Sequence, residues 1–254
     1  MAKALILFSG GLDSHLAARL LQGLCSEVAG ICFTSPFFGS DDARTAASDL
    51  GLELVEHDFS DEIMRILRGP RHGFGKNMNP CIDCHTAMIA IAHGLLPALG
   101  ADFVATGEVL GERPMSQNRQ SLDLVARESG AGQLLLRPLS ARLLEPTIPE
   151  QKGWVEREAL LDIQGRSRKP QMELARAGLP GHQVEGLAVL RHGPLPQHFA
   201  GGHEIRSQCG KQAVCDSDHG GMAIYTRVHV LAVAIARRLK HFQMLGSYIF
   251  DSQG

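Results

Sequence analysis

The sequence is short of aromatic residues and of net charge. It contains one Trp, two Tyr and ten Phe among 254 residues, and its formal net charge is −2. So few aromatic side chains argue against a stacking platform for single-stranded RNA. The near-neutral balance means that any RNA contact must come from local clusters of basic residues rather than from a global field.

Long apolar runs are also scarce. The stretch closest to a membrane span, 222–239, is interrupted by Arg227, His229, Arg237 and Arg238, and no basic-then-apolar signal precedes the first motif. We therefore expect a cytoplasmic protein that does not enter a membrane. The six cysteines should be reduced in that compartment, so closely spaced cysteines indicate a metal or redox site rather than a disulfide.

What the sequence does contain is an alternation of strand and helix patterns. Apolar runs at 4–8, 28–33, 52–55 and 103–106 predict buried strands, and helical patterns at 13–21, 41–50, 61–67, 83–99 and 117–129 follow them. This order predicts an α/β fold with a doubly wound parallel sheet in a domain of residues 1–180. The alternation fades near Gly181, so we expect 181–254 to be an atypical, partly disordered region with one amphipathic helix at about 222–245.

The first predicted strand leads directly into Ser9-Gly10-Gly11-Leu12-Asp13-Ser14. Ligands bind at the carboxyl edge of a parallel sheet, and a helix that starts there points unpaired N–H groups at an anion. The glycines allow close backbone approach, the serines add hydroxyl donors, and Asp13 can hold Mg²⁺. The loop has no lysine, which excludes the Gly-x-x-x-x-Gly-Lys type. The alternative is a simple turn in which Asp13 caps the helix.

A second motif, Cys81-x-x-Cys84, opens the predicted helix at 83–99. Two thiols at this spacing can share one metal ion or cluster, and a helix N-terminus favours the thiolate. Two alternatives remain open for the pair: a thiol–persulfide relay, or two buried structural cysteines.

Basic residues gather in three places. One group, which includes Lys76, precedes the cysteine pair; a second, with Arg113 and Arg119, flanks the end of the strand at 103–106; a third lies at 166–169. Such residues fit ATP phosphates or an RNA backbone, and a solvated loop surface is the alternative. We predict RNA contacts for Lys76, Arg113 and Arg119.

The segment Phe8-Ser9-Gly10-Gly11-Leu12-Asp13-Ser14 resembles the signature of the PP-loop ATP pyrophosphatases, which have an adenine nucleotide α-hydrolase-like fold. The blocks at 72–85, 105–117 and 136–140 extend the resemblance to stand-alone PP-loop proteins related to the tRNA 4-thiouridine synthetases and other tRNA thiolation enzymes. The resemblance covers roughly Met1 to Ala177.

The resemblance implies ATP-dependent tRNA thiolation: adenylylation of a uridine carbonyl oxygen, then transfer of sulfur with release of AMP. Asp13, Cys81 and Cys84 would be catalytic. The implied cofactors are ATP, Mg²⁺ and a [4Fe–4S] cluster on Cys81, Cys84 and a third cysteine. The implied partners are tRNA, a sulfur donor (a protein or sulfide) and a second copy of the chain. The residues implied in ATP binding are Phe8, Ser9, Gly10, Gly11, Asp13, Ser14, Phe33, Thr106 and Gly107.

One departure from the family concerns the third cysteine. Where the family has Gly-Gly-Cys after the helix at 171–177, this chain reads Gly178-Leu179-Pro180-Gly181, and the next cysteines are Cys209 and Cys215. The cluster and the persulfide relay therefore both stay open. Two other functions are alternatives: a PP-loop ligase or small-molecule sulfurtransferase, and a non-catalytic nucleotide- or metal-binding remnant.

Overall fold

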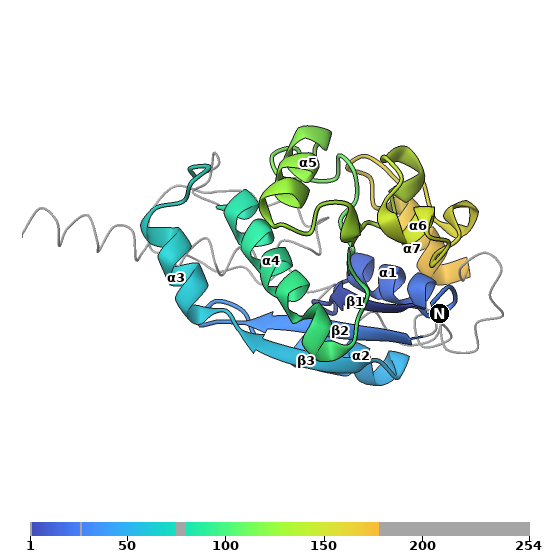
Figure 1. The fold of residues 1–254 in the computed structure, drawn as a ribbon, viewed down its shortest axis with the longest axis horizontal. Helices are drawn as coiled ribbons and strands as arrows, with labels where there is room; N and C mark the ends of the chain where they lie inside the picture. Colours follow the sequence, from blue (N-terminus) through green and yellow to red (C-terminus); the bar gives the residue numbers. More distant parts are fainter. Residues whose placement is uncertain (1, 26, 75–79, 178–254) are drawn as a thin grey trace, which may run out of the picture.

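A computed structural model describes residues 2–25, 27–74 and 80–177 (Figure 1). Five strands form one sheet in the order β3-β2-β1-β4-β5, and every neighbouring pair is parallel. The strands are β1 Lys3–Leu7, β2 Glu27–Thr34, β3 Glu53–Asp58, β4 Phe103–Thr106 and β5 Leu135–Leu136. The predicted α/β class and the parallel sheet are confirmed.

The central strand β1 is buried on both faces, and it sets the register of the site. Ala4, Leu5 and Ile6 are fully buried. Leu7 and Thr106, the last residues of β1 and β4, lie opposite each other, whereas β2 continues past Ile31 to Thr34. Because the strands are parallel, the loops that follow β1 and β4 are neighbours at the carboxyl edge.

Helices cover both faces of the sheet, as the doubly wound prediction requires. One face carries α1 Leu12–Gln22 and α2 Asp41–Leu50, and α7 Lys169–Ala177 packs on α1. The other face carries α3 Ser60–Arg68, α4 Cys81–Leu99 and α5 Arg119–Glu128. The sheet separates two apolar clusters, with Ile6 on the first side and Leu5 on the second. A short helix, α6 Ile148–Gln151, and three 3₁₀ turns at 132–134, 141–143 and 157–159 complete the described part.

The predicted boundaries of helices and strands agree best with the structure where a glycine or a continuous apolar run marks them. The helix at 41–50 and the strand at 103–106 have the predicted bounds, and Gly51 ends α2 with a φ of 61°. The helix α5 begins later than predicted, at Arg119, because the Asn118 side chain caps it by accepting the Ser121 N–H at 2.9 Å. The sequence analysis missed β5, which has only two residues.

By length and composition, α4 is long and apolar enough to cross a membrane, with a mean hydropathy of 1.3. In this fold the helix lies against the sheet, where Ile89 and Ala92 are fully buried in the second apolar cluster. The core therefore accounts for the apolar residues Ile89, Ala92 and Leu96 of this helix. The predicted C-terminal region 181–254, its helix at 222–245, Cys209, Cys215 and Lys76 lie outside the described residues.

Candidate functional site

The phosphate loop follows β1, and its backbone is shaped by two glycines. Gly10 has a φ of 76°, and Gly11 precedes the first residue of α1 without a side-chain cap. The Ser14 hydroxyl donates to the Gly11 carbonyl at 2.9 Å and lies 3.4 Å from the Ser9 hydroxyl. The start of α1 therefore keeps backbone N–H groups available for an anion, and the capping alternative for Asp13 does not describe this helix.

Close backbone contacts hold this loop from two sides. A Cβ on Gly10 would lie 2.5 Å from the Asp42 carbonyl group, at the start of α2. A Cβ on Gly107 would lie 2.6 Å from the Ser14 backbone nitrogen, and Thr106 before it is buried. Only glycine permits these approaches without a shift of the backbone. The structure thus brings the predicted residues Gly10, Ser14 and Gly107 together.

Asp13 faces a charged group that the sequence analysis did not assemble. Its Oδ2 atom accepts from the Arg168 guanidinium at 3.1 Å, and the Arg168 Nε lies 3.7 Å from the Glu112 carboxylate. Burial raises the pKa of Asp13, against the opposing charges of Arg168 and Arg113. Burial and the neighbouring Asp13 raise the pKa of Glu112. Glu112 belongs to the sequence block 105–117, and its position beside Asp13 becomes apparent only in the folded chain.

The cysteine pair lies in the first turn of α4, and both thiols are partly buried. Burial, with smaller contributions from Cys81 and Asp83, raises the pKa of Cys84 to about 12. For Cys84 the desolvation therefore outweighs the favourable helix N-terminus. Within the described ranges, no three His, Cys, Asp or Glu side chains lie close enough to hold a metal ion. This part of the chain supplies two thiols of the predicted cluster site.

A buried ionic network fixes the start of α4 to the sheet. Glu108 accepts from the Arg137 Nε at 2.9 Å and the Thr106 hydroxyl at 3.1 Å, and its other oxygen lies 2.8 Å from the His85 Nδ1. Burial alone would raise the pKa of Glu108, but Arg137 and His85 hold it well below its ordinary range. The members of this network come from three separate sequence blocks, 72–85, 105–117 and 136–140, so their pairing appears only in the folded chain.

Hydrogen bonds to Asp83 join α4 to the segment that precedes it. Asp83 is a buried residue that lies between Cys81 and Cys84 in the sequence. The Asp83 carboxylate accepts the backbone N–H groups of Arg71 and His72 at 3.1 and 3.2 Å. The His72 ring lies between Asp83 and Glu128, at 3.2 and 3.3 Å. The Asp83 carboxylate is therefore committed to the preceding loop rather than turned toward the thiols.

Phe33, one of the residues implied in ATP binding, lies near the end of β2. The Phe33 ring is buried and packs edge-on against Phe59 and His57, with centroids 5.6 Å apart in both pairs. On the other side of the sheet, burial raises the pKa of the Cys32 thiol to about 11. The Phe33 side chain is thus part of the core, and its role in ATP binding stays a prediction.

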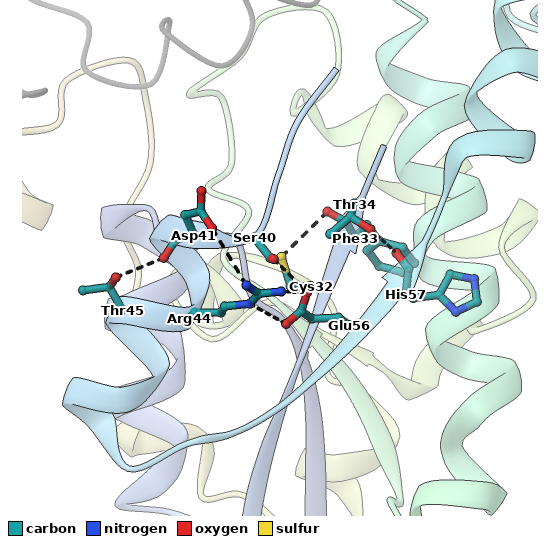
Figure 2. Close-up of polar contacts among 9 residues, drawn as sticks. All are labelled: Cys32, Phe33, Thr34, Ser40, Asp41, Arg44, Thr45, Glu56 and His57. Carbon is teal, nitrogen blue, oxygen red and sulfur yellow. Dashed lines mark hydrogen bonds and ion pairs between the residues drawn. The ribbon is translucent and has the colours of Figure 1, made fainter. Parts of the chain in front are cut away.

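Figure 2 shows how this edge is joined to α2. The Arg44 guanidinium donates twice to the Glu56 carboxylate, at 2.6 and 2.8 Å, and the Ser40 hydroxyl donates to it at 2.7 Å. Hydrogen bonds from Arg44 and then Ser40 lower the pKa of Glu56 to about 2. These contacts link β3 to the start of α2, which in turn lies against Gly10.

Both of the predicted RNA-binding arginines already have protein partners. Arg113 lies close enough to Asp13 and Glu112 to lower the pKa of both carboxyl groups. The Arg119 guanidinium donates to the Leu143 carbonyl oxygen. Their roles in RNA binding stay predictions.

No protein-family model matches the chain. It is 33% identical over 132 residues to a tRNA-specific 2-thiouridylase MnmA of Roseiflexus castenholzii, a match that covers 42% of this chain and 34% of that protein. It is 28% identical over 247 residues to the same enzyme of Chloroflexus aurantiacus, with 79% and 67% covered. The chain thus spans about a third of the length of the first of these curated relatives.

The PP-loop resemblance of the sequence is borne out by these relatives together with the parallel sheet and its phosphate loop. The sequence similarity to these relatives indicates the PP-loop ATP pyrophosphatase superfamily. A solved complex of a 4-thiouridine synthetase with RNA and bound ATP is 19% identical, with a TM-score of 0.39, and covers 75% of this PP-loop chain and 52% of that one.

Two groups of atoms with different chemistry lie at one edge of the sheet. The first is the N-terminus of α1, which has no side-chain cap, with the Asp13 and Glu112 carboxylates beside it. The second is a pair of thiols at the start of α4, held by the Glu108 network. The adjacent residues Gly107 and Glu108 contact both parts.

Proposed function

We propose that this chain uses ATP to activate a uridine carbonyl oxygen of tRNA and then replaces that oxygen with sulfur. The observation that carries the proposal is the pair Gly107 and Glu108. Gly107 lies against Ser14 of the phosphate loop, and Glu108 binds His85 beside Cys84. One short segment thus couples a phosphate site to two thiols, and the relatives with similar sequences are named tRNA-specific 2-thiouridylases.

In the activating half, the uridine carbonyl oxygen would attack the α-phosphorus of ATP while the bond to the β-phosphate breaks. The N–H groups at the start of α1 and the Ser9 and Ser14 hydroxyls would bind the departing pyrophosphate. Asp13 and Glu112 fit a Mg²⁺ ion, because both are carboxylates and the buried Asp13 Oδ1 has no hydrogen-bond partner. When bound, Mg²⁺ would neutralise phosphate charge.

In the sulfur half, Cys81 would carry a terminal sulfur as a persulfide received from a sulfur donor. That sulfur attacks the activated carbon, and AMP leaves with the former carbonyl oxygen. The Cys84 thiol then attacks the Cys81 sulfur, which releases the thiocarbonyl and leaves a disulfide for a thiol reductant. A [4Fe–4S] cluster is the alternative carrier. Cys81 and Cys84 would give it two thiolates, and its third ligand would come from outside the described residues.

Substrate binding would use basic residues, with Lys76, Arg113 and Arg119 as the candidates for contacts with the tRNA backbone. The low content of aromatic residues favours phosphate contacts over base stacking. A second copy of the chain would extend the surface. A tRNA substrate in turn places the enzyme in the cytoplasm.

The decisive experiment is mass spectrometry of tRNA nucleosides from a deletion strain. We expect one thionucleoside to disappear, to return with the wild-type gene, and to stay absent with Asp13→Asn or Cys81→Ala. Unchanged thionucleosides in the deletion strain would refute the proposal. ATP–pyrophosphate exchange with purified protein separates the two halves, because Asp13→Asn should abolish exchange whereas Cys81→Ala should retain it.

The sulfur carrier is decided by anaerobic purification followed by iron and acid-labile sulfide analysis. A cluster predicts iron and sulfide in the wild-type protein and their loss in Cys81→Ala. A persulfide relay predicts no iron, and a cyanide-releasable sulfur on Cys81 after incubation with a sulfur donor.

A further inference from the structure

Two carboxylates at the phosphate loop share a single guanidinium. Asp13 comes from the first turn of α1, and Glu112 from the loop that follows β4. Arg168 lies between them, 3.1 Å from the Asp13 Oδ2 and 3.7 Å from the Glu112 Oε1. At these distances, the charge of Arg168 favours the ionised form of both carboxyl groups, which burial opposes.

Backbone hydrogen bonds fix the segment that carries Arg168 in this position. Gln164 pairs with Leu110 as a parallel bridge, and the Gly165 N–H donates to the Leu110 carbonyl at 2.8 Å. The helix α7 then packs on α1, with Ala175 buried in the shared apolar cluster. The segment that carries Arg168 is therefore fixed along the loop that carries Glu112.

The pairing nevertheless leaves buried polar atoms unsatisfied. Asp13 Oδ1 and Arg168 Nε have no hydrogen-bond partner. Neither has Oε1 of Gln171, a fully buried residue whose amide group donates to Glu112 at 3.4 Å. An unpartnered buried polar atom costs stability, so native proteins keep one mainly where a ligand completes it. Two of these three atoms are oxygens, the ligand type that Mg²⁺ prefers.

Charge balance indicates what happens when that ligand arrives. Asp13 and Glu112 are balanced by two cations, Arg168 and Arg113, which both lower the pKa of the two carboxyl groups. A divalent cation would take over this role. The guanidinium of Arg168 would then be left without its carboxylates, beside a loop that binds phosphate.

We propose that Arg168 is an exchangeable counter-ion, which neutralises Asp13 and Glu112 until a divalent cation binds them and then pairs with the pyrophosphate of ATP. Gln171 is the positioning residue: its amide nitrogen donates to Glu112, and its buried, unpartnered amide oxygen is available to the incoming cation. This inference rests on the proposed function for its ATP site. It adds to that function a residue of α7 that exchanges partners as the site is loaded.

The test uses the full-length protein, with Mn²⁺ as the metal probe and inorganic pyrophosphate as the anion. Electron paramagnetic resonance measures Mn²⁺ affinity without nucleotide, and calorimetry measures pyrophosphate affinity with Mg²⁺ present. Removal of the competing cation in Arg168→Gln should tighten Mn²⁺ binding by about 5- to 10-fold, a usual size for coupled binding. Loss of the same guanidinium should weaken pyrophosphate binding by about 10-fold.

Three further variants make the result unambiguous. Arg168→Lys keeps the charge and should retain a Mn²⁺ affinity close to that of the wild type. Arg127→Gln removes an equal charge from an exposed position on α5 and should change neither affinity. Asp13→Asn should abolish Mn²⁺ binding. A thermal melt of each variant checks that the variant is folded.

Opposite shifts of the two affinities in Arg168→Gln support the inference. Equal or parallel shifts, or Mn²⁺ binding that survives Asp13→Asn, overturn it. None of these measurements involves tRNA or sulfur. If the affinity shifts are absent but the deletion strain still loses a thionucleoside, the proposed function stands and only this inference fails. If the affinity shifts are present but the thionucleosides are unchanged, only the proposed function fails.

Discussion

The phosphate half and the cysteine half of the site are held by different forces. Around the phosphate loop, glycines let backbones touch: Gly10 lies against α2, and Gly107 lies against α1. Around the cysteines, a buried ionic network from Glu108 to Arg137 and His85 fixes the start of α4. The first half leaves no room for a Cβ at Gly10 or Gly107, whereas the second depends on the charges of Glu108 and Arg137. A substitution that adds a side chain at a glycine should therefore disrupt the phosphate half, and one that removes a buried charge should disrupt the cysteine half.

The largest effect is expected for Glu108→Gln, which breaks the cysteine half. The variant leaves Arg137 charged, buried and without a counter-ion. Loss of one partner of a buried ion pair typically costs about 3–5 kcal/mol of unfolding free energy. Urea denaturation measures this loss, and Arg137→Met alone and combined with Glu108→Gln completes a double-mutant cycle. An additive cycle would show that the two side chains do not depend on each other.

The same variant should show a defined pH dependence. The pKa of Glu108 is lowered in the folded protein from its ordinary value of 4.5. The stabilisation from its ionised form is therefore fully present above about pH 4.5 and is lost as the pH falls through the folded pKa. The stability difference between wild type and Glu108→Gln should be constant near neutrality and shrink below pH 4.5. A difference that grows on the acid side would contradict this sign.

The phosphate half should break next, in Gly10→Ala. The new Cβ would meet the Asp42 carbonyl group at 2.5 Å, and alanine is strained at a φ of 76°. Overpacking and the left-handed backbone together should cost about 2–4 kcal/mol and abolish nucleotide binding. Gly11→Ala is the matched control, because its Cβ meets only the Ser9 hydroxyl at 3.5 Å. If both variants melt alike, the contact with α2 does not shape the loop.

This contrast also explains what sequence reasoning could find. Gly10, Gly11 and Asp13 lie close together in the sequence, so a single pattern identified the phosphate loop. The continuous apolar runs predicted the central strands. Glu108 and Arg137 are separated by 28 residues and follow different strands, so their pairing needed the sheet order. The same holds for Arg168 and Asp13, whose contact depends on the packing of α7 on α1.

Alkylation of the thiols sharpens the cysteine half. Burial raises the pKa of Cys84 to about 12 from an ordinary 9.0, so its thiolate is scarce at pH 8. The thiolate that remains is more nucleophilic, which leaves a net slowing of about 30- to 60-fold. Iodoacetamide labelling followed by mass spectrometry, with urea-unfolded protein as the reference, measures this factor. Labelling of native Cys84 at the unfolded rate would show that the thiol is exposed.

The smallest effects are expected where the phosphate half reaches the surface. The Arg44 and Glu56 side chains are 58% and 34% exposed, so water screens their ion pair, and Arg44→Ala should barely change the melting temperature. Ser40 donates to the same carboxylate from a buried position, 5% exposed, at the residue before α2.

Ser40→Ala should therefore lower stability and ATP affinity more than Arg44→Ala, because the buried hydroxyl rather than the exposed charge fixes α2 against Gly10. Thermal melts and ATP titrations of the two variants rank them. The reverse order would mean that the surface ion pair holds α2 in place, and that the phosphate half depends on charge as the cysteine half does.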